Sequence, residues 1–546
     1  MKTKNKIYAL LALSATLATT SCIEETFPQD DYATGDQVSE SPTALDGSAN
    51  GIASQMVQGY LVYGEQVHET DMAYPGLMIA QTEMLGDMYP GGSNPGYDWF
   101  RNYNTFQQNF NDRSYFSYLP WFTLYKFVKG CNDIIANVDV TQEGLSPEVK
   151  AIGGIAHACR AFDYYMLTVF FEPAENKYTN VDAVKGLTVP FVTEKTTGEV
   201  AKNNPRAKHA DMIAFILSDL DKAELALKDQ QSTNKMLPSL AVVYGIRAKV
   251  HLWDEDYANA AKYARMAIDE SKATPVTAAQ WEDPTTGFAQ ANQAWMWYLH
   301  YSAESMGNLC NFVGWMSGEA DWGYSSLTLP MIDKSLYDKM GEKDFRRTTF
   351  LNPGKFDYYS YKTVRSKEFI EDAPDYLALK FRCLNGDWET YSIGGAIDVP
   401  IMRVEEMYLI EAEAIGASQG VAQGVQKLNE FMVNIGQRDP DYNFSTNDLR
   451  TFQLEVLTQM RIEFWGEGNA FPSAKRLKPG VMQNYEGTNA PADIFKVNCE
   501  GIKPNWNLVI PRTETQSNQA LQTTNNPDPT QAIVAPSPVG EYSKPQ

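Results

Sequence analysis

Apolar residues recur at helical spacing along much of the chain. Between residues 211 and 227 they occupy one side of a helical wheel, at Met212, Phe215, Ile216, Leu220, Ala223 and Leu227. Intervals of three and four residues are typical of an amphipathic helix with one face toward a core. The pattern therefore predicts a helix over 209–227, and similar spacing predicts helices over 121–138 and 157–171.

Two segments share one pattern of aromatic and small residues. The first carries Tyr244, Ala248, Ala260, Ala264 and Ala267, and the second carries Tyr408, Ala412, Gly424, Leu428 and Phe431 at the same offsets. Small side chains let two antiparallel helices approach closely, and an aromatic ring fills the groove beside them, as in tetratricopeptide repeats. We predict two such helical pairs, with turns at 254–256 and 418–420, although two unrelated hairpins would also fit.

Three segments lack this periodicity and are rich in Gly, Pro, Asn and aromatic residues: 84–118, 274–330 and 350–400. Loops of this length inside a compact protein are usually functional. The predicted fold is mainly α, a scaffold of tetratricopeptide-like helical pairs at about 118–272 and 400–470. Long irregular insertions interrupt it, at about 84–118 and 274–400.

Composition and charge narrow the possible functions. The chain has 546 residues, a formal charge of −22 and 43% hydrophobic residues, which excludes a mainly disordered protein. Its acidity argues against nucleic-acid binding, because phosphate recognition needs a basic face. No G-x-S-x-G, H-E-x-x-H or P-loop motif occurs, and no EF-hand loop. We expect no enzyme activity and no cofactor, apart from a possible structural Ca²⁺ held by a chance carboxylate cluster.

The first residues read as a secretory signal. Lys2, Lys4 and Lys6 precede an apolar stretch over 7–17, and a small residue stands before Cys22. This arrangement resembles a lipoprotein signal, in which the cysteine is acylated and becomes the mature N-terminus; an ordinary cleaved signal is the alternative. We expect a signal peptide over 1–21, then the lipid-bearing Cys22 and a flexible tether over 22–48. A triacylated cysteine would attach the protein stably to a membrane.

The other five cysteines stand alone in the sequence, with no C-x-x-C pair. An odd number of isolated cysteines in a chain of this size does not indicate a disulfide framework. We expect buried free thiols at Cys131, Cys159, Cys310, Cys383 and Cys499.

Residues 160–167 read RAFDYYML and residues 400–414 read PIMRVEEMYLIEAEA. Five further segments carry motifs of the same kind: 121–137, 216–223, 241–268, 460–468 and 510–527. Taken in chain order, the seven segments resemble the SusD/RagB family of Bacteroidetes outer-membrane lipoproteins. Met460 and the residues after Gly468 depart from the family pattern. The resemblance implies one SusD-like domain over 49–546, a superhelix of tetratricopeptide-like helical pairs whose long insertions form a binding face. It also implies a lipid-anchored protein on the outer membrane, facing the cell exterior.

The resemblance also implies a function. SusD-like proteins bind an oligosaccharide or polysaccharide and deliver it to a SusC-like TonB-dependent transporter, without catalysis. A peptide- or protein-binding RagB-like lipoprotein and a secreted glycoside hydrolase remain as alternatives.

A glycan site needs flat aromatic rings for the apolar sugar faces and planar polar groups for the hydroxyls. Two aromatic-rich loops supply both kinds of side chain. The first contributes Tyr97, Trp99, Arg101, Asn102 and Tyr103, and the second contributes Tyr301, Trp315, Asp321, Trp322 and Tyr324. We predict these residues as the glycan site, with Trp99, Asn102, Trp315 and Trp322 as the strongest candidates.

Charged residues also cluster in two predicted helices. The clusters comprise Arg403, Glu406, Glu411 and Glu413 in one helix, and Arg461, Glu463 and Glu467 in the other. We interpret them as structural ion pairs that join helices, because nothing in their spacing suggests a catalytic carboxyl pair.

Overall fold

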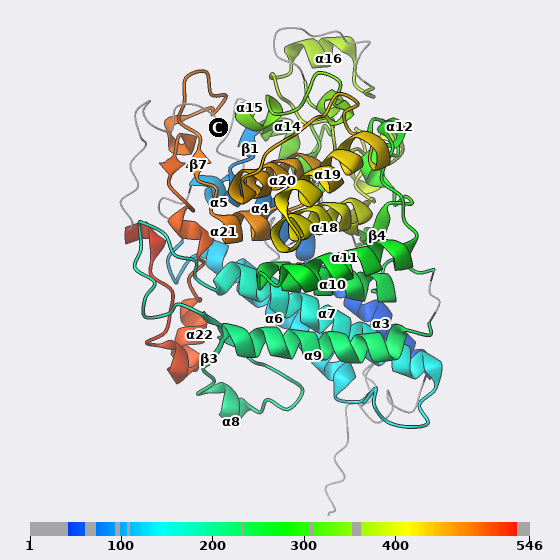
Figure 1. Cartoon of the computed structure of the whole chain (residues 1–546), viewed down its shortest axis with the longest axis vertical. Coiled ribbons are helices and arrows are strands. Elements are labelled where there is room, and N and C mark those ends of the chain that lie inside the picture. The colour runs from blue at the N-terminus through cyan, green and yellow to red at the C-terminus, as the bar shows by residue number, and fades with distance from the viewer. Residues whose placement is uncertain are drawn as a thin grey trace, which may run out of the picture.

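The computed structural model describes residues 42–59, 72–92, 99–105, 110–230, 233–305, 309–351 and 362–531. The predicted signal peptide and Cys22 lie outside these residues, as does Tyr97 of the predicted site. The first helix within the described residues, α3 (Pro42–Gln55), reaches into the segment predicted as tether. Figure 1 shows a mainly helical protein, as the sequence predicted.

The scaffold consists of long helices stacked in chain order. Helix α7 packs between α6 and α9, α10 packs on α11, and α11 packs on α18, which also contacts α19 and α20 (Figure 1). The bounds of these helices are α6 (Tyr115–Ile135), α7 (Pro147–Phe171), α9 (His209–Leu227), α10 (Leu240–Trp253), α11 (Tyr257–Ser271), α18 (Val404–Ser418), α19 (Val421–Glu430) and α20 (Leu449–Glu463). The predicted helix over 209–227 is confirmed at both ends.

Both predicted helical pairs are present, as α10 with α11 and α18 with α19. Small residues let the two helices of the second pair approach closely, as expected. A Cβ added to Gly424 would lie 2.5 Å from the Cα of Gly416 in the facing helix, so no larger side chain fits there. Across the second pair, the rings of Tyr408 and Phe431 stack with centroids 5.5 Å apart. Close approach and an aromatic filler thus hold the second pair together.

Within the described residues, short strands form four two-stranded antiparallel sheets, which pair β1 with β5, β2 with β3, β4 with β6 and β7 with β8. The strands are β1 (Met88–Pro90), β2 (Leu187–Pro190), β3 (Arg206–Lys208), β4 (Trp295–His300), β5 (Pro330–Ile332), β6 (Asp398–Arg403), β7 (Val481–Met482) and β8 (Asn498–Cys499). The remaining α-helices are α4 (Tyr74–Leu85), α5 (Arg101–Thr105), α8 (Gly198–Ala201), α12 (Ala278–Trp281), α13 (Val313–Met316), α14 (Ser325–Thr328), α15 (Lys334–Tyr337), α16 (Lys367–Asp372), α17 (Tyr391–Gly394), α21 (Phe471–Leu477) and α22 (Arg512–Ser517).

The predicted ion pairs are formed, and most are buried. Glu463 is fully buried and pairs with Arg346, Arg403 and Arg438, at 3.2, 3.0 and 2.7 Å. Arg403 also reaches Glu467, at 2.8 Å. The other acids of the predicted clusters are paired too: Glu406 with Lys249, Glu411 with Arg265 and Glu413 with Arg476. These contacts join helices far apart in sequence, which confirms the structural interpretation.

The five cysteines named above are all buried and free. In the part of the chain that the structure describes, no group of three or more His, Cys, Asp or Glu side chains could hold a metal ion. Among the same residues, no helix has both the length and the apolar character to cross a membrane.

Candidate functional site

The two predicted aromatic loops meet in space. The ring of Phe100, which follows Trp99, packs edge-on against Trp315 of the second loop with centroids 5.1 Å apart. A third segment joins them, because the backbone N–H of Asp321 donates to the carbonyl of Trp388 at 2.9 Å. We call the surface formed by residues 99–105, 309–329, 362–372 and 384–397 the loop face.

A stacked aromatic pair lies at the centre of the loop face. Trp315 and Tyr324 are nearly parallel, with centroids 4.3 Å apart and an interplanar angle of 12°. Trp315 is buried, and its indole N–H donates to the carbonyl of Cys310 at 3.1 Å, whereas Tyr324 is partly exposed. The buried indole therefore fixes the orientation of a surface ring.

A second aromatic group lies beside the first. The Arg365 guanidinium is held between the rings of Phe369 and Trp388, 3.7 and 3.9 Å from their centroids. Its Nη1 donates to the carbonyl of Glu319 at 2.6 Å. Burial lowers the pKa of Arg365, and the nearby Asp321 carboxylate opposes that shift. Both rings are partly exposed, so they combine apolar surface with a fixed cation.

Exposed apolar side chains surround these groups. Leu309, Leu327, Tyr391 and Ile393 are 47%, 37%, 39% and 48% exposed, and all four belong to the loop face. An apolar patch edged by polar groups is typical of a binding surface.

Of the predicted residues in the first loop, three are partly exposed. Trp99 packs against Tyr115 and Phe116 of α6, at centroid distances of 5.8 and 5.5 Å. Asn102 donates from its side chain to the carbonyl of Trp99 at 2.8 Å, and Arg101 follows on α5. The structure thus brings Trp99, Arg101 and Asn102 to the edge of the loop face.

Four predicted aromatic residues are buried, which corrects the expectation that they form an exposed ledge. Tyr103 and Tyr301 are 1% and 3% exposed, and their hydroxyls donate to the backbone carbonyls of Phe116 and Met72. Trp315 and Trp322 are also buried, at 3% and 6%. These rings pack beneath the surface and so support the loop face, whereas Tyr324 and Asp321 retain exposed area.

Sequence reasoning missed Arg365, Phe369, Trp388 and Tyr391. They lie in the segment 350–400 that was recognised as loop-rich, and the run Asp387 to Tyr391 has the same mixture of acidic and aromatic residues as the other two loops. That mixture is a signal that could have found Trp388 and Tyr391, but the packing of Arg365 between the rings is tertiary.

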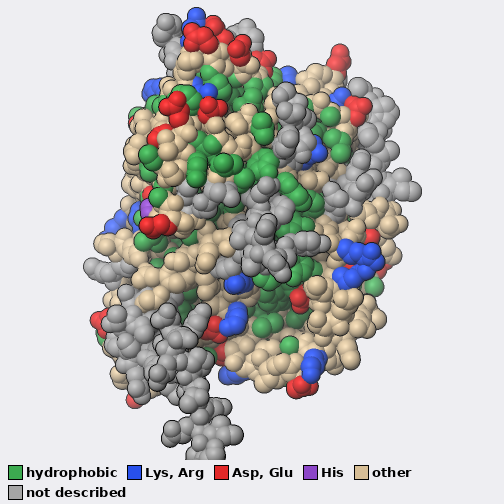
Figure 2. Space-filling model, turned by 180° about the vertical axis from the view of Figure 1, so that it is seen from behind, with side chains coloured by type: hydrophobic (Ala, Val, Ile, Leu, Met, Phe, Trp, Pro, Cys, Tyr) green, Lys and Arg blue, Asp and Glu red, His purple; other side chains and the backbone are tan. Residues whose placement is uncertain are grey.

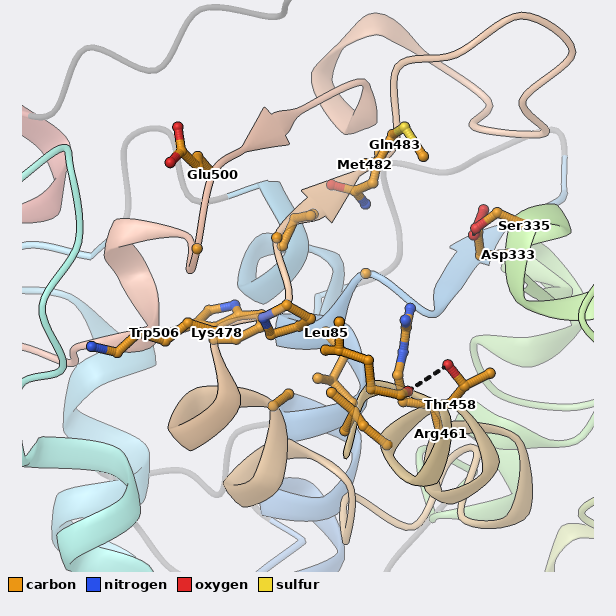
Figure 3. Close-up of a pocket in the computed structure, with 18 of the residues that line it drawn as sticks. Leu85, Asp333, Ser335, Thr458, Arg461, Lys478, Met482, Gln483, Glu500 and Trp506 are labelled. Carbon is orange, nitrogen blue, oxygen red and sulfur yellow. Dashed lines mark hydrogen bonds between the residues drawn. The ribbon is translucent and has the colours of Figure 1, made fainter. Parts of the chain in front are cut away.

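A separate cavity of about 300 Å³ lies between α4, α20, α21 and β7. In Figure 3, Arg461 reaches up from α20 between the wall that carries Asp333 and Ser335 and the wall that carries Trp506. Arg461 is already paired with Asp87, so one cation serves two neighbouring buried carboxyl groups. Burial raises the pKa of Asp333 to about 6, and the Asp87 carboxylate adds to the shift.

This shift predicts how Asp333→Asn changes stability with pH. The folded protein binds the Asp333 proton more tightly than the unfolded chain does, so ionisation lowers the free energy of unfolding as the pH rises from about 4 to about 6. We expect Asp333→Asn to stabilise the protein by about 1–2 kcal/mol at pH 7.5 and to have little effect near pH 4. Urea unfolding at both pH values measures the difference; equal effects at the two pH values would contradict it.

Comparisons with known proteins agree with this architecture. Two family models match: residues 73–252 match a SusD-like model described as starch-binding and associating with the outer membrane, and residues 331–539 match the model of the SusD family. The chain belongs to the SusD/RagB family. The two matches together span most of the chain, and they include six of the seven segments that resemble family motifs and the first part of the seventh, 241–268.

Relatives and solved structures extend the match. SusD-like protein P2 of Formosa agariphila is 23% identical over 431 residues, which cover 74% of this chain and 79% of that protein. A SusD-like carbohydrate-binding protein from Bacteroides vulgatus superimposes with a TM-score of 0.67 at 17% identity, over 88% of this chain and 97% of the other. A SusD superfamily protein from Bacteroides thetaiotaomicron also superimposes with a TM-score of 0.67, at 18% identity, over 89% of this chain and 100% of the other. The SusD-like fold is therefore shared across nearly the whole chain.

Proposed function

We propose that this SusD-like protein is a non-catalytic glycan-binding lipoprotein of the cell surface. It captures an oligosaccharide or polysaccharide on the loop face and delivers it to a SusC-like TonB-dependent transporter. The observation that carries the proposal is the loop face itself, where partly exposed rings are fixed by buried aromatic and cationic neighbours. The matching family model is described as associating with the outer membrane, and this description supports the proposed location.

The geometry suits a sugar chain. Tyr324 rests on Trp315, and Trp388 rests on Arg365, so neither ring needs to be ordered when a ligand binds. Asp321 lies near Arg365, and Arg101 follows Trp99 at the start of α5, so each supplies a charged group of the loop face for hydroxyl groups of the ligand. A single sugar unit would bind weakly, with a Kd on the order of millimolar. Affinity would come from several rings that engage one chain together.

The positions of the acidic side chains with a raised pKa argue against a glycoside hydrolase. A glycosidase needs a carboxylic acid whose raised pKa lets it protonate the leaving oxygen. Burial raises the pKa of the described residues Asp163, Asp333 and Glu514, and each of them lies outside the loop face. We therefore propose binding without catalysis.

Membrane attachment and delivery rest on the sequence. The acylated Cys22 and the tether after it would hold the domain at the membrane, within reach of a transporter in the same membrane. Co-localisation of this kind raises the effective concentration of captured glycan at the transporter.

A glycan array tests the function. The recombinant domain should bind one class of polysaccharide from a panel of plant, fungal, mucin-type and starch glycans, and it should release no reducing sugar from it. Binding to peptides with no binding to any glycan would favour the RagB-like alternative. Release of reducing sugar would favour the hydrolase.

A further inference from the structure

A second concave surface lies along α6, away from the loop face. It is a groove of about 590 Å³ between α6, α8 and α22, within the size range of small-ligand sites. Its lining is mainly apolar and includes Tyr118, Phe122 and Tyr125, all partly exposed. Figure 2 shows hydrophobic side chains in a band down the back of the molecule, hollowed in its lower half, with basic side chains nearby.

The aromatic side chains of the groove form two pairs on α6. The rings of Tyr118 and Phe122 lie within 15° of parallel, with centroids 5.8 Å apart. Trp121 and Tyr125 lie 4.8 Å apart, and the Tyr125 hydroxyl donates to the carbonyl of Pro190 at 2.7 Å. Because helical neighbours and this hydrogen bond hold the rings, the surface is rigid before any ligand arrives.

Polar groups stand at the margin of the groove. Three lysines line it, Lys126, Lys129 and Lys202, and one acid, Glu514. Among the described residues, no second carboxyl group lines the groove beside Glu514, so the lining lacks the pair of acids that a glycosidase uses. The Glu514 carboxyl is partly buried and interacts with Trp121, and burial raises its pKa. Rings on the floor with charged groups at the rim match the chemistry of the loop face, and they suit a ligand with apolar faces and hydroxyl edges.

The groove and the loop face are connected by α6. Trp99, at the edge of the loop face, packs against Tyr115 and Phe116, one helical turn before Tyr118. From Phe116 to Tyr125 the helix advances about 14 Å. Aromatic side chains therefore continue along α6 from one site toward the other, buried at Tyr115 and Phe116 and partly exposed at Tyr118, Phe122 and Tyr125.

We propose that this groove is a second carbohydrate subsite, which takes further sugar units of the same chain that the loop face holds. The inference rests on the proposed function and extends it: the protein prefers polysaccharide to short oligosaccharide because a long chain reaches both surfaces. Binding at two linked subsites raises affinity without any change in the loop face.

The test fills the groove without touching its rings. Ala201 lines the groove and is exposed on α8, so Ala201→Trp should occupy it at little cost in stability. Val200 is 54% exposed on the same helix and does not line the groove, so Val200→Trp is the matched control. Thermal unfolding first confirms that both variants fold. Their affinities for the polysaccharide selected on the array, and for short oligosaccharides of it, are then compared with those of the wild type.

We expect Ala201→Trp to weaken polysaccharide binding by about ten-fold, leaving short-oligosaccharide binding unchanged, whereas Val200→Trp changes neither. Unchanged polysaccharide binding by Ala201→Trp would overturn the subsite and leave the proposed function standing. A wild-type protein that binds no glycan would overturn the proposed function, and the subsite with it. If Ala201→Trp lost binding to the transporter and kept polysaccharide binding unchanged, the groove would be a protein contact, and the inference would be overturned.

Discussion

Glu463→Ala is expected to destabilise the fold by about 3–5 kcal/mol, enough to leave much of the protein unfolded at moderate temperature. The carboxylate lies fully buried among Arg346, Arg403 and Arg438. Burial alone would raise the pKa of Glu463, but Arg438 and Arg403 hold it well below its ordinary value. Removing this acid leaves buried guanidinium charge without its partner, which costs more than the ion pair itself contributes.

The control for this variant is an exposed ion pair of the same chemistry. Glu371 pairs with Lys367 at 3.3 Å on α16, and both side chains are about half exposed. Glu371→Ala should cost about 0.5 kcal/mol or less, because water screens the pair. Chemical denaturation followed by circular dichroism compares the two variants. A loss below about 1 kcal/mol for Glu463→Ala would show that the network does not hold the helices together.

The scaffold could be predicted because its signals are local. The apolar residues of α9 repeat within one helix, and the aromatic and small residues of the two helical pairs repeat at fixed offsets. Helix starts were less accurate. Helix α7 begins at Pro147, where the Ser146 side chain accepts from the N–H of Val149, although the prediction began at residue 157. The pair Ser146-Pro147 is a local signal for a helix start, and the apolar spacing does not report it.

The loop face could be predicted only in outline. Composition located the aromatic loops, but it could not separate exposed rings from buried ones. The hydroxyl of Tyr301 is satisfied by the carbonyl of Met72, which lies more than two hundred residues earlier in the chain. Likewise, the packing of Arg365 against Trp388 depends on how two loop segments fold together. Burial of an aromatic residue is a tertiary property, and no local pattern reports it.

Trp388→Ala is expected to weaken glycan binding by about ten-fold or more. Trp388 is a partly exposed ring of the loop face, and the Arg365 guanidinium lies 3.9 Å from its centroid. A stacked ring contributes about 0.5–1.5 kcal/mol beyond the apolar area that it buries, and each 1.4 kcal/mol is a factor of about ten in Kd. Trp388→Phe should retain much of the affinity, because a flat ring remains over the guanidinium.

The central claim, that the loop face is the glycan site, is tested most directly by titration calorimetry. An oligosaccharide selected on the array is titrated into the wild type, Trp388→Ala and Trp253→Ala; Trp253 is a partly buried tryptophan at the end of α10, remote from the loop face. We predict that Kd rises about ten-fold for Trp388→Ala and stays at the wild-type value for Trp253→Ala. Equal affinity in all three proteins would contradict the account.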